Sequence, residues 1–62
     1  MSAARYGCEI VHSVDDGGYY VEVVDYAKGR TVATLPRRGR VYKTRAEAVV
    51  AGREYLADRV LA

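Results

Sequence analysis

The sequence of 62 residues has few of the residue types that brace very small domains. Its one cysteine, Cys8, excludes a disulfide within the chain. The chain also has one histidine, His12, whereas a structural zinc site needs roughly four thiolate and imidazole ligands. We therefore expect no metal and no other cofactor. Chains below about 70–80 residues usually need such a brace, an association or very good packing. Of the two that remain, association and very good packing, we favour association and expect a homodimer.

Long apolar runs are also absent. No segment approaches the ~20 apolar residues of a membrane-spanning helix, and residues 1–6 lack the apolar centre of a signal peptide. A single cysteine fits a reducing compartment. These absences predict a cytoplasmic protein without a membrane partner. We interpret residues 1–62 as one domain, in which residues 1–5 form a flexible tail.

Alternating apolar residues predict three strands, at residues 6–14, 19–26 and 31–35. Turns that contain Gly17 and Gly29 join them, because glycine adopts left-handed backbone at little cost. Consecutive strands with short connections are usually antiparallel neighbours. The sequence therefore predicts a three-stranded β-meander.

Two glutamates indicate which face of this sheet is solvated. Glu9 and Glu22 require water, so we expect the opposite face of each strand to form the core. The residues expected on the inward side are Cys8, Ile10, His12 and Val14 in the first strand and Tyr19, Val21 and Val23 in the second. Among them, we expect His12 at the edge or rim of the sheet.

Residues 44–62 have the only helical spacing in the chain. Thr44 and Glu47, three residues apart, form a capping-box pattern at its start. At about 100° per residue, one helix face carries the residues expected to cover the sheet: Ala48, Val49, Gly52, Leu56 and Val60. The predicted fold class is α+β, a three-stranded antiparallel meander packed against one C-terminal helix in the order β-β-β-α.

The helix and the sheet both carry more apolar surface than they can bury on each other. A second helix stripe consists of Ala46, Val50, Ala57 and Leu61, and the outer sheet face carries Val11, Tyr20, Val24 and Tyr26. Large apolar patches on soluble domains mark interaction sites. The predicted interface residues, for a homodimer or a protein partner, are Tyr20, Val24, Tyr26, Val50, Ala57 and Leu61, and the sequence leaves the sheet and the helix as rival interfaces.

The charges are unevenly distributed and suggest a second function. Residues 28–45 carry seven cations and no acid, whereas residues 1–27 carry one cation and five acids. A cluster of five cations at the helix start is the candidate nucleic-acid site: Arg37, Arg38, Arg40, Lys43 and Arg45. Tyr20, Tyr26 and Tyr42 would add stacking surfaces. The alternatives are a solvated loop or contact with the acidic part of a second subunit.

No combination of residues predicts catalysis. Cys8 and His12 lie about 13 Å apart along an extended strand, too far for a thiolate–imidazole pair. Asp15 and Asp16 are typical turn residues. The glycines at residues 17–18 precede a strand, whereas a phosphate-binding loop precedes a helix. We therefore expect a binding protein that is not an enzyme.

Two segments carry a resemblance to a known family. The run DDGGYYVEV at residues 15–23, followed by Asp25, and the run TRAEA at residues 44–48 resemble HicB-like antitoxins. That family has Pro-Gly-Cys where this chain has YAKG at residues 26–29. The resemblance implies the same β-β-β-α domain and a non-enzymatic role, because HicB-like domains bind and mask a toxin and usually dimerise.

Overall fold

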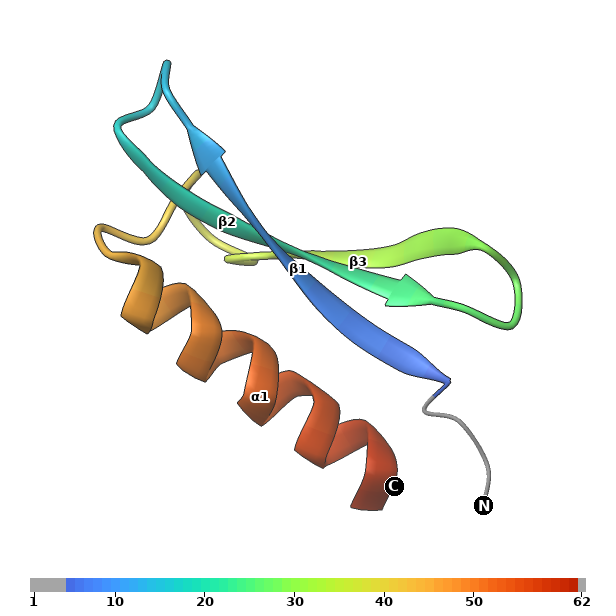
Figure 1. Ribbon diagram of the computed structural model, residues 1–62. Coiled ribbons are helices and arrows are strands. Elements are labelled where there is room, and N and C mark those ends of the chain that lie inside the picture. Colours follow the sequence, from blue (N-terminus) through green and yellow to red (C-terminus); the bar gives the residue numbers. More distant parts are fainter. Residues whose placement is uncertain (1–4, 62) are drawn as a thin grey trace.

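The computed structural model describes residues 5–61 and consists of one sheet and one helix (Figure 1). The strands are β1 (Tyr6–Ser13), β2 (Gly18–Asp25) and β3 (Arg30–Leu35), and the helix is α1 (Arg45–Leu61). The sheet order is β1-β2-β3 and both pairings are antiparallel. The predicted β-β-β-α fold class is confirmed.

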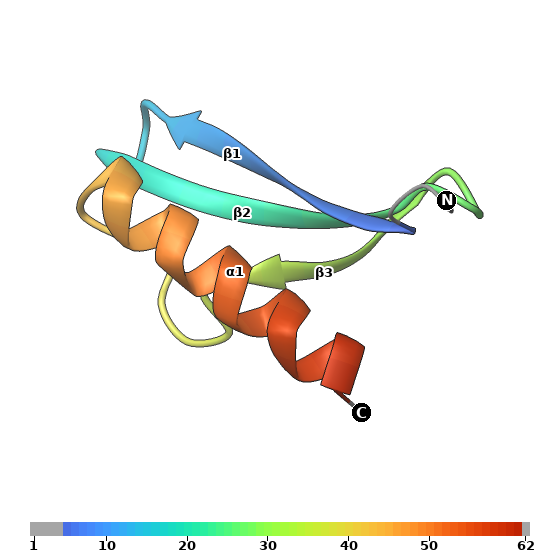
Figure 2. The same cartoon turned by 60° about the horizontal axis from the view of Figure 1, so that its bottom comes forward.

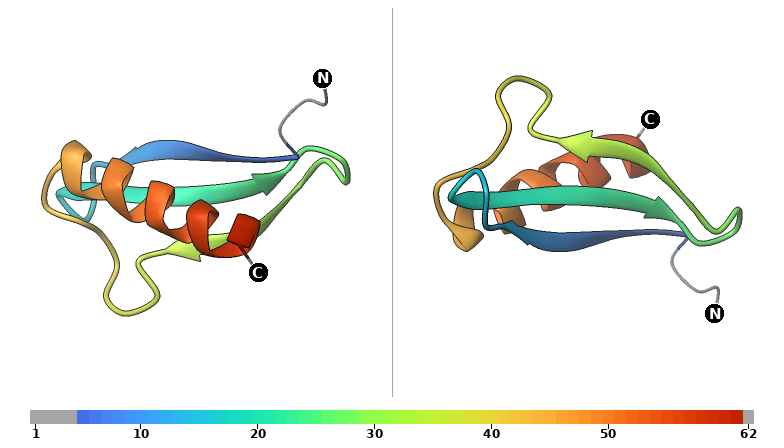
Figure 3. Two further views of the ribbon diagram at one scale, coloured as in Figure 1. Left: turned by 90° about the horizontal axis from the view of Figure 1, so that it is seen from below. Right: turned by 90° about the horizontal axis from the view of Figure 1, so that it is seen from above.

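The helix packs against one face of the sheet and leaves the other face open. Figure 2 shows α1 lying across the strands, and the two opposite views of Figure 3 show that no element within residues 5–61 covers the outer face. Within the part of the chain that the structure describes, α1 is neither long nor apolar enough to cross a membrane.

The core lies between α1 and the centre of the sheet. The β1–β2 register places Ile10 opposite Val21 and Cys8 opposite Val23. The fully buried hydrophobic residues are Val21, Val23, Leu35 and Ala48. Partly buried hydrophobic residues pack around them, including Tyr19 and Tyr55, as well as Leu56 from the predicted inner helix face. Since so few side chains are fully buried, each core contact carries a large share of the stability.

The helix packs closely on the sheet at Gly52, which is buried. A Cβ atom added to Gly52 would lie 2.9 Å from Cys8 Sγ, 3.3 Å from Cys8 Cβ and 3.4 Å from Val21 Cγ1. The lack of a side chain at this position therefore sets the distance between α1 and β1.

The first strand ends earlier than predicted, and one residue expected on the core side is exposed. β1 stops at Ser13, and Val14 lies in the turn with 80 % of its surface exposed. The physical reason is the twist of the strands, which carries the tip of the hairpin beyond the reach of α1 (Figure 1). The prediction of an inward Val14 is therefore wrong. His12 is exposed, as expected for the edge or rim of the sheet, and stacks on Tyr19, with ring centroids 4.9 Å apart.

The loop after β3 leaves the sheet and then returns to it. Leu35 is paired with Val21. Tyr19, which lies two positions closer to the start of β2, forms a bridge with Tyr42. The Tyr19 and Tyr42 amides each donate to the other residue's carbonyl oxygen, at 2.9 and 2.7 Å. Residues 36–41 therefore project from the sheet edge as a loop (Figure 3).

The helix starts at the predicted capping box. The Glu47 amide donates to Thr44 Oγ1 at 3.1 Å, and that hydroxyl lies 3.2 Å from Glu47 Oε1. The first bond satisfies one of the free amides of the first helical turn.

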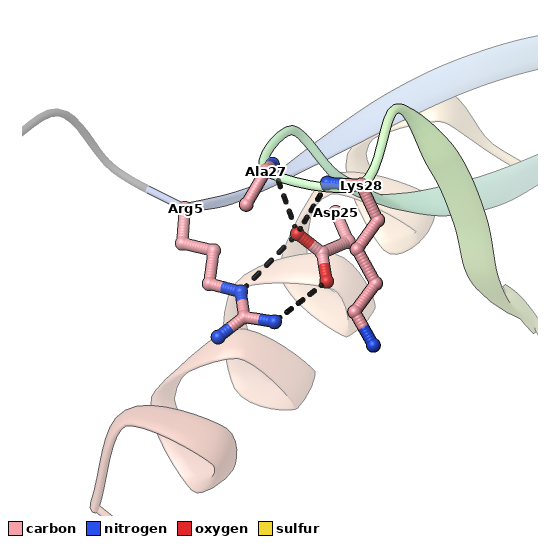
Figure 4. Close-up of polar contacts among 4 residues, drawn as sticks. All are labelled: Arg5, Asp25, Ala27 and Lys28. Atoms are coloured by element: carbon pink, nitrogen blue, oxygen red, sulfur yellow. Dashed lines mark hydrogen bonds and ion pairs between the residues drawn. The ribbon is translucent and has the colours of Figure 1, made fainter.

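A buried carboxylate connects the turn after β2 to the start of β1 (Figure 4). Asp25 is only 2 % exposed. Its Oδ1 and Oδ2 atoms accept from Arg5 Nε at 3.2 Å and Arg5 Nη2 at 3.1 Å, and Oδ1 also accepts from the amides of Ala27 and Lys28. Arg5 was assigned to a flexible tail, but these bonds fix it to the sheet. The rest of that predicted tail, residues 1–4, lies outside the described residues.

Candidate binding surfaces

The outer sheet face combines a carboxylate pair with half-buried apolar side chains. Glu9 lies directly opposite Glu22, and the next pair on this face along the two strands is Val11 with Tyr20. Like charges directly opposite each other destabilise a sheet. At the other side of the glutamates, Val24 is opposite Gly7. This face therefore carries negative charge flanked by apolar side chains. The negative charge disfavours contact with phosphate groups.

Tyr26 extends this outer face into the turn that follows β2. Its side chain is 56 % exposed, and its ring covers Gly7, where an added Cβ atom would overlap the ring atoms. Tyr26 is thus at the end of the sheet opposite to the loop at residues 36–41 (Figure 1). The structure does not bring it to the predicted basic cluster.

The outward face of α1 is hollowed near the start of the helix. A hollow of about 500 Å³ lies between Tyr42 and α1. Its lining consists of Tyr42, Ala46, Glu47, Val50, Ala51 and Glu54. Val50 is 53 % exposed, and burial, assisted by the Glu54 carboxylate, raises the pKa of Tyr42. Two residues of the predicted second helix stripe, Ala46 and Val50, thus line a concave apolar surface, and Glu47 and Glu54 give this surface an acidic edge.

The other two members of that stripe lie further along α1. Ala57 is exposed. The side chain of Leu61 lies outside the described residues, so its place in the predicted interface is untested.

The structure divides the basic segment between the two ends of the sheet. Lys28 and Arg30 belong to the β2–β3 turn and the start of β3, whereas the candidate nucleic-acid residues follow β3 at the other end (Figure 1). All five candidates are exposed. Arg40 Nη1 forms an ion pair with Asp16 Oδ1 at 3.4 Å, at the tip of the first hairpin. Asp16 therefore partly neutralises the charge of Arg40.

Arginine and tyrosine side chains lie next to one another where the second half of α1 meets the start of β1. The guanidinium of Arg59 lies 4.9 Å from the ring centroid of Tyr6 and 5.6 Å from that of Tyr55, and its Nη1 donates to Tyr55 Oη at 3.0 Å. Arg37 lies 5.7 Å from the Tyr55 centroid, and Arg5 lies 5.2 Å from that of Tyr6. We call these five residues the arginine–tyrosine stack.

Sequence reasoning did not find the arginine–tyrosine stack, because its members are far apart in the chain. The one local signal is the position of Arg59, which follows Tyr55 by one helical turn on the side of α1 that faces the sheet. Guanidinium groups close to aromatic faces are attracted by the ring quadrupole. The tyrosine rings of the stack thus extend the core, and the charged ends of its arginines reach solvent.

The side chains considered for nucleophilic chemistry are held by packing contacts. Cys8 lies against Gly52 at the helix, and burial raises the pKa of its thiol, which disfavours the reactive thiolate. His12 stacks on Tyr19 at the other end of β1. Among residues 5–61, no three His, Cys, Asp or Glu side chains gather in a way that would hold a metal ion.

Comparison of the chain with protein-family models, with curated proteins and with solved structures finds no match.

Proposed function

We propose that this chain is a non-enzymatic protein-binding module that forms a homodimer through the outward face of α1. The observation that carries the proposal is the hollow beside Val50, where an aliphatic side chain remains 53 % exposed on a concave, largely apolar surface. Such a surface buries apolar area when a second copy covers it. The second copy also supplies the additional burial that a domain of this size needs.

The charge of the outer sheet face favours the helix over the sheet as the interface between copies. Glu9 and Glu22 lie opposite each other at the centre of that face. In a twofold symmetric contact the same patch meets itself, which would bring four carboxylates together. Burial of unpaired charges costs several kcal/mol, so the sheet is a poor surface for self-association.

The two edges of the helix stripe carry opposite charges. At about 100° per residue, Glu54 lies to one side of Val50 and Arg53 to the other. When two such helices pack parallel across a twofold axis, the acidic edge of each meets the basic edge of its partner. This complementarity supports a second copy as the occupant of the outward face.

The outer sheet face remains open in such a dimer and is the proposed site for a different protein. Its carboxylate pair lies between Tyr20 and Val24, an arrangement that suits a partner with lysine or arginine beside apolar side chains. The resemblance to HicB-like antitoxins, an expectation from residues 15–23 and 44–48, implies the same kind of role.

Replacing Val50 by glutamate is expected to dissociate the homodimer, because it would bury a carboxylate in an apolar interface. For a dimer, the melting temperature rises with protein concentration. We expect this rise in the wild type between about 5 and 500 µM and its loss in Val50→Glu. Val14→Glu is the matched control, since Val14 is exposed in the first hairpin. A melting temperature independent of concentration in the wild type would refute the proposal.

A second candidate function is nucleic-acid binding, and the projecting loop at residues 36–41 favours it. Arg38 on this loop, and Lys43 and Arg45 next to the helix start, are all exposed. We expect affinity for a generic duplex to fall steeply with the logarithm of salt concentration, with a slope set by the number of phosphates neutralised. Fluorescence anisotropy in a salt titration measures this slope. No binding at about 50 mM salt would exclude this second function.

A further inference from the structure

Two exposed arginines from different elements meet on the ring of Tyr55. Arg37 comes from the loop after β3, and Arg59 comes from the second half of α1. Their guanidinium carbons lie 5.7 and 5.6 Å from the ring centroid. Since their positions in the chain are 22 residues apart, the fold itself brings the two charges together.

The two arginines have more hydrogen-bond donors than the neighbouring tyrosines can use. A guanidinium has five N–H groups in one plane. A hydrogen bond with Tyr6 and one with Tyr55 raise the pKa of Arg59, and in the second of these Arg59 donates through Nη1 to Tyr55 Oη at 3.0 Å. The remaining donors of Arg59 and those of Arg37 lie in planar forks, which match the spacing of oxygens in a phosphate group.

Neither of the ion pairs among residues 5–61 includes an arginine of this site. These pairs are Arg5 with Asp25 and Arg40 with Asp16. Two like charges beside one ring repel each other, and a bound anion relieves this repulsion.

We propose that Arg37 and Arg59, held on the ring of Tyr55, form a binding site for a phosphate group of a nucleic-acid backbone. The proposal rests on the second candidate function and extends its surface from residues 37–45 onto α1. Arg38 follows Arg37 directly on the projecting loop. A row of cations suits the successive phosphates of a polymer better than one phosphorylated side chain.

Glutamine substitutions at three arginines test this site. Arg37→Gln and Arg59→Gln remove the two proposed ligands, and Arg53→Gln removes one exposed arginine from the same helix as Arg59. The probe is a fluorescent oligothymidylate of about ten nucleotides. Loss of a charged hydrogen-bond donor weakens binding by about tenfold, so we expect that loss for Arg37→Gln and Arg59→Gln and less than about threefold for the Arg53→Gln control.

The alternative outcomes separate this site from the function on which it rests. Equal losses in all three variants would overturn the site, because charge alone would then explain binding, but would leave the second candidate function standing. A wild type that does not bind the oligonucleotide at low salt would overturn the site, and a wild type that also fails to bind a generic duplex would overturn both. Binding of a phosphotyrosine peptide without oligonucleotide binding would overturn the choice of nucleic acid.

A second set of variants covers the case in which a glutamine variant unfolds. Arg37→Lys and Arg59→Lys preserve the charge but lose the planar fork, with Arg53→Lys as the control. We expect the first two to weaken oligonucleotide binding and the control to leave it unchanged. Wild-type affinity in all three lysine variants would refute the site. Binding of inorganic phosphate can be followed through the NMR signals of the arginine Nε–H groups. We expect the signals of Arg37 and Arg59 to shift and that of Arg53 to stay in place. A uniform shift of all arginine signals would contradict the proposed site.

Discussion

Replacing Gly52 by valine is expected to cost about 2–3 kcal/mol of the free energy of unfolding, as is typical of an overpacked core. The Cβ atom would lie 3.3 Å from Cys8 Cβ and 3.4 Å from Val21 Cγ1, and the branched methyl groups would extend further into these atoms. Domains of this size have only a few kcal/mol of stability in total. We therefore expect a large unfolded fraction, measurable by circular dichroism during urea denaturation.

Gly52→Ala is the matched control for this prediction. Its close contact is to Cys8 Sγ at 2.9 Å, the end of a side chain that can rotate away. Alanine also gains about 1 kcal/mol of helix propensity over glycine. We expect Gly52→Ala to stay within about 1 kcal/mol of the wild type. A valine variant as stable as the alanine variant would contradict the close packing of α1 on β1.

Replacing Asp25 by asparagine is expected to lower the melting temperature at neutral pH, with a difference that disappears in acid. Hydrogen bonds from Arg5 lower the pKa of Asp25 below its usual range, assisted by the charge of Arg5 and by the amides of Lys28 and Ala27. A lowered pKa in the folded state means that the carboxylate stabilises the fold above its unfolded pKa of about 4. This contribution is lost as the pH falls below that value, through the lower pKa of the folded state.

Melting curves from neutral pH down to about pH 2 would measure this difference. Asp15→Asn is the control, because Asp15 is exposed in the first turn. We expect Asp25→Asn and the wild type to converge in acid, and Asp15→Asn to follow the wild type at every pH. A gap between wild type and Asp25→Asn that is the same at neutral and acid pH would show that the Arg5–Asp25 pair does not stabilise the fold.

The local features of the fold could be predicted from the sequence because neighbouring residues determine them. Thr44 and Glu47 are three residues apart and mark the helix start. Gly17 and Gly29 occupy the two turns, with φ angles of 69° and 65° that disfavour side chains. The alternation of Val21 and Val23 with Glu22 correctly assigned the buried face of β2.

The features that the sequence could not predict depend on contacts between distant segments. The bond between Arg5 and Asp25 and the convergence of Arg37 with Arg59 need the completed sheet and the path of α1. Val14 continues the alternation of β1, and only the position of the helix shows that nothing covers it. Charge counts likewise placed Arg40 in a free cluster, although it pairs with Asp16.

Sedimentation equilibrium of the wild-type protein tests the central claim, self-association through the outward face of α1, most directly. At tens of micromolar, a typical working concentration for small dimers, the proposal predicts the mass of two chains and, for Val50→Glu, the mass of one. A single-chain mass for the wild type over the whole concentration range would contradict it.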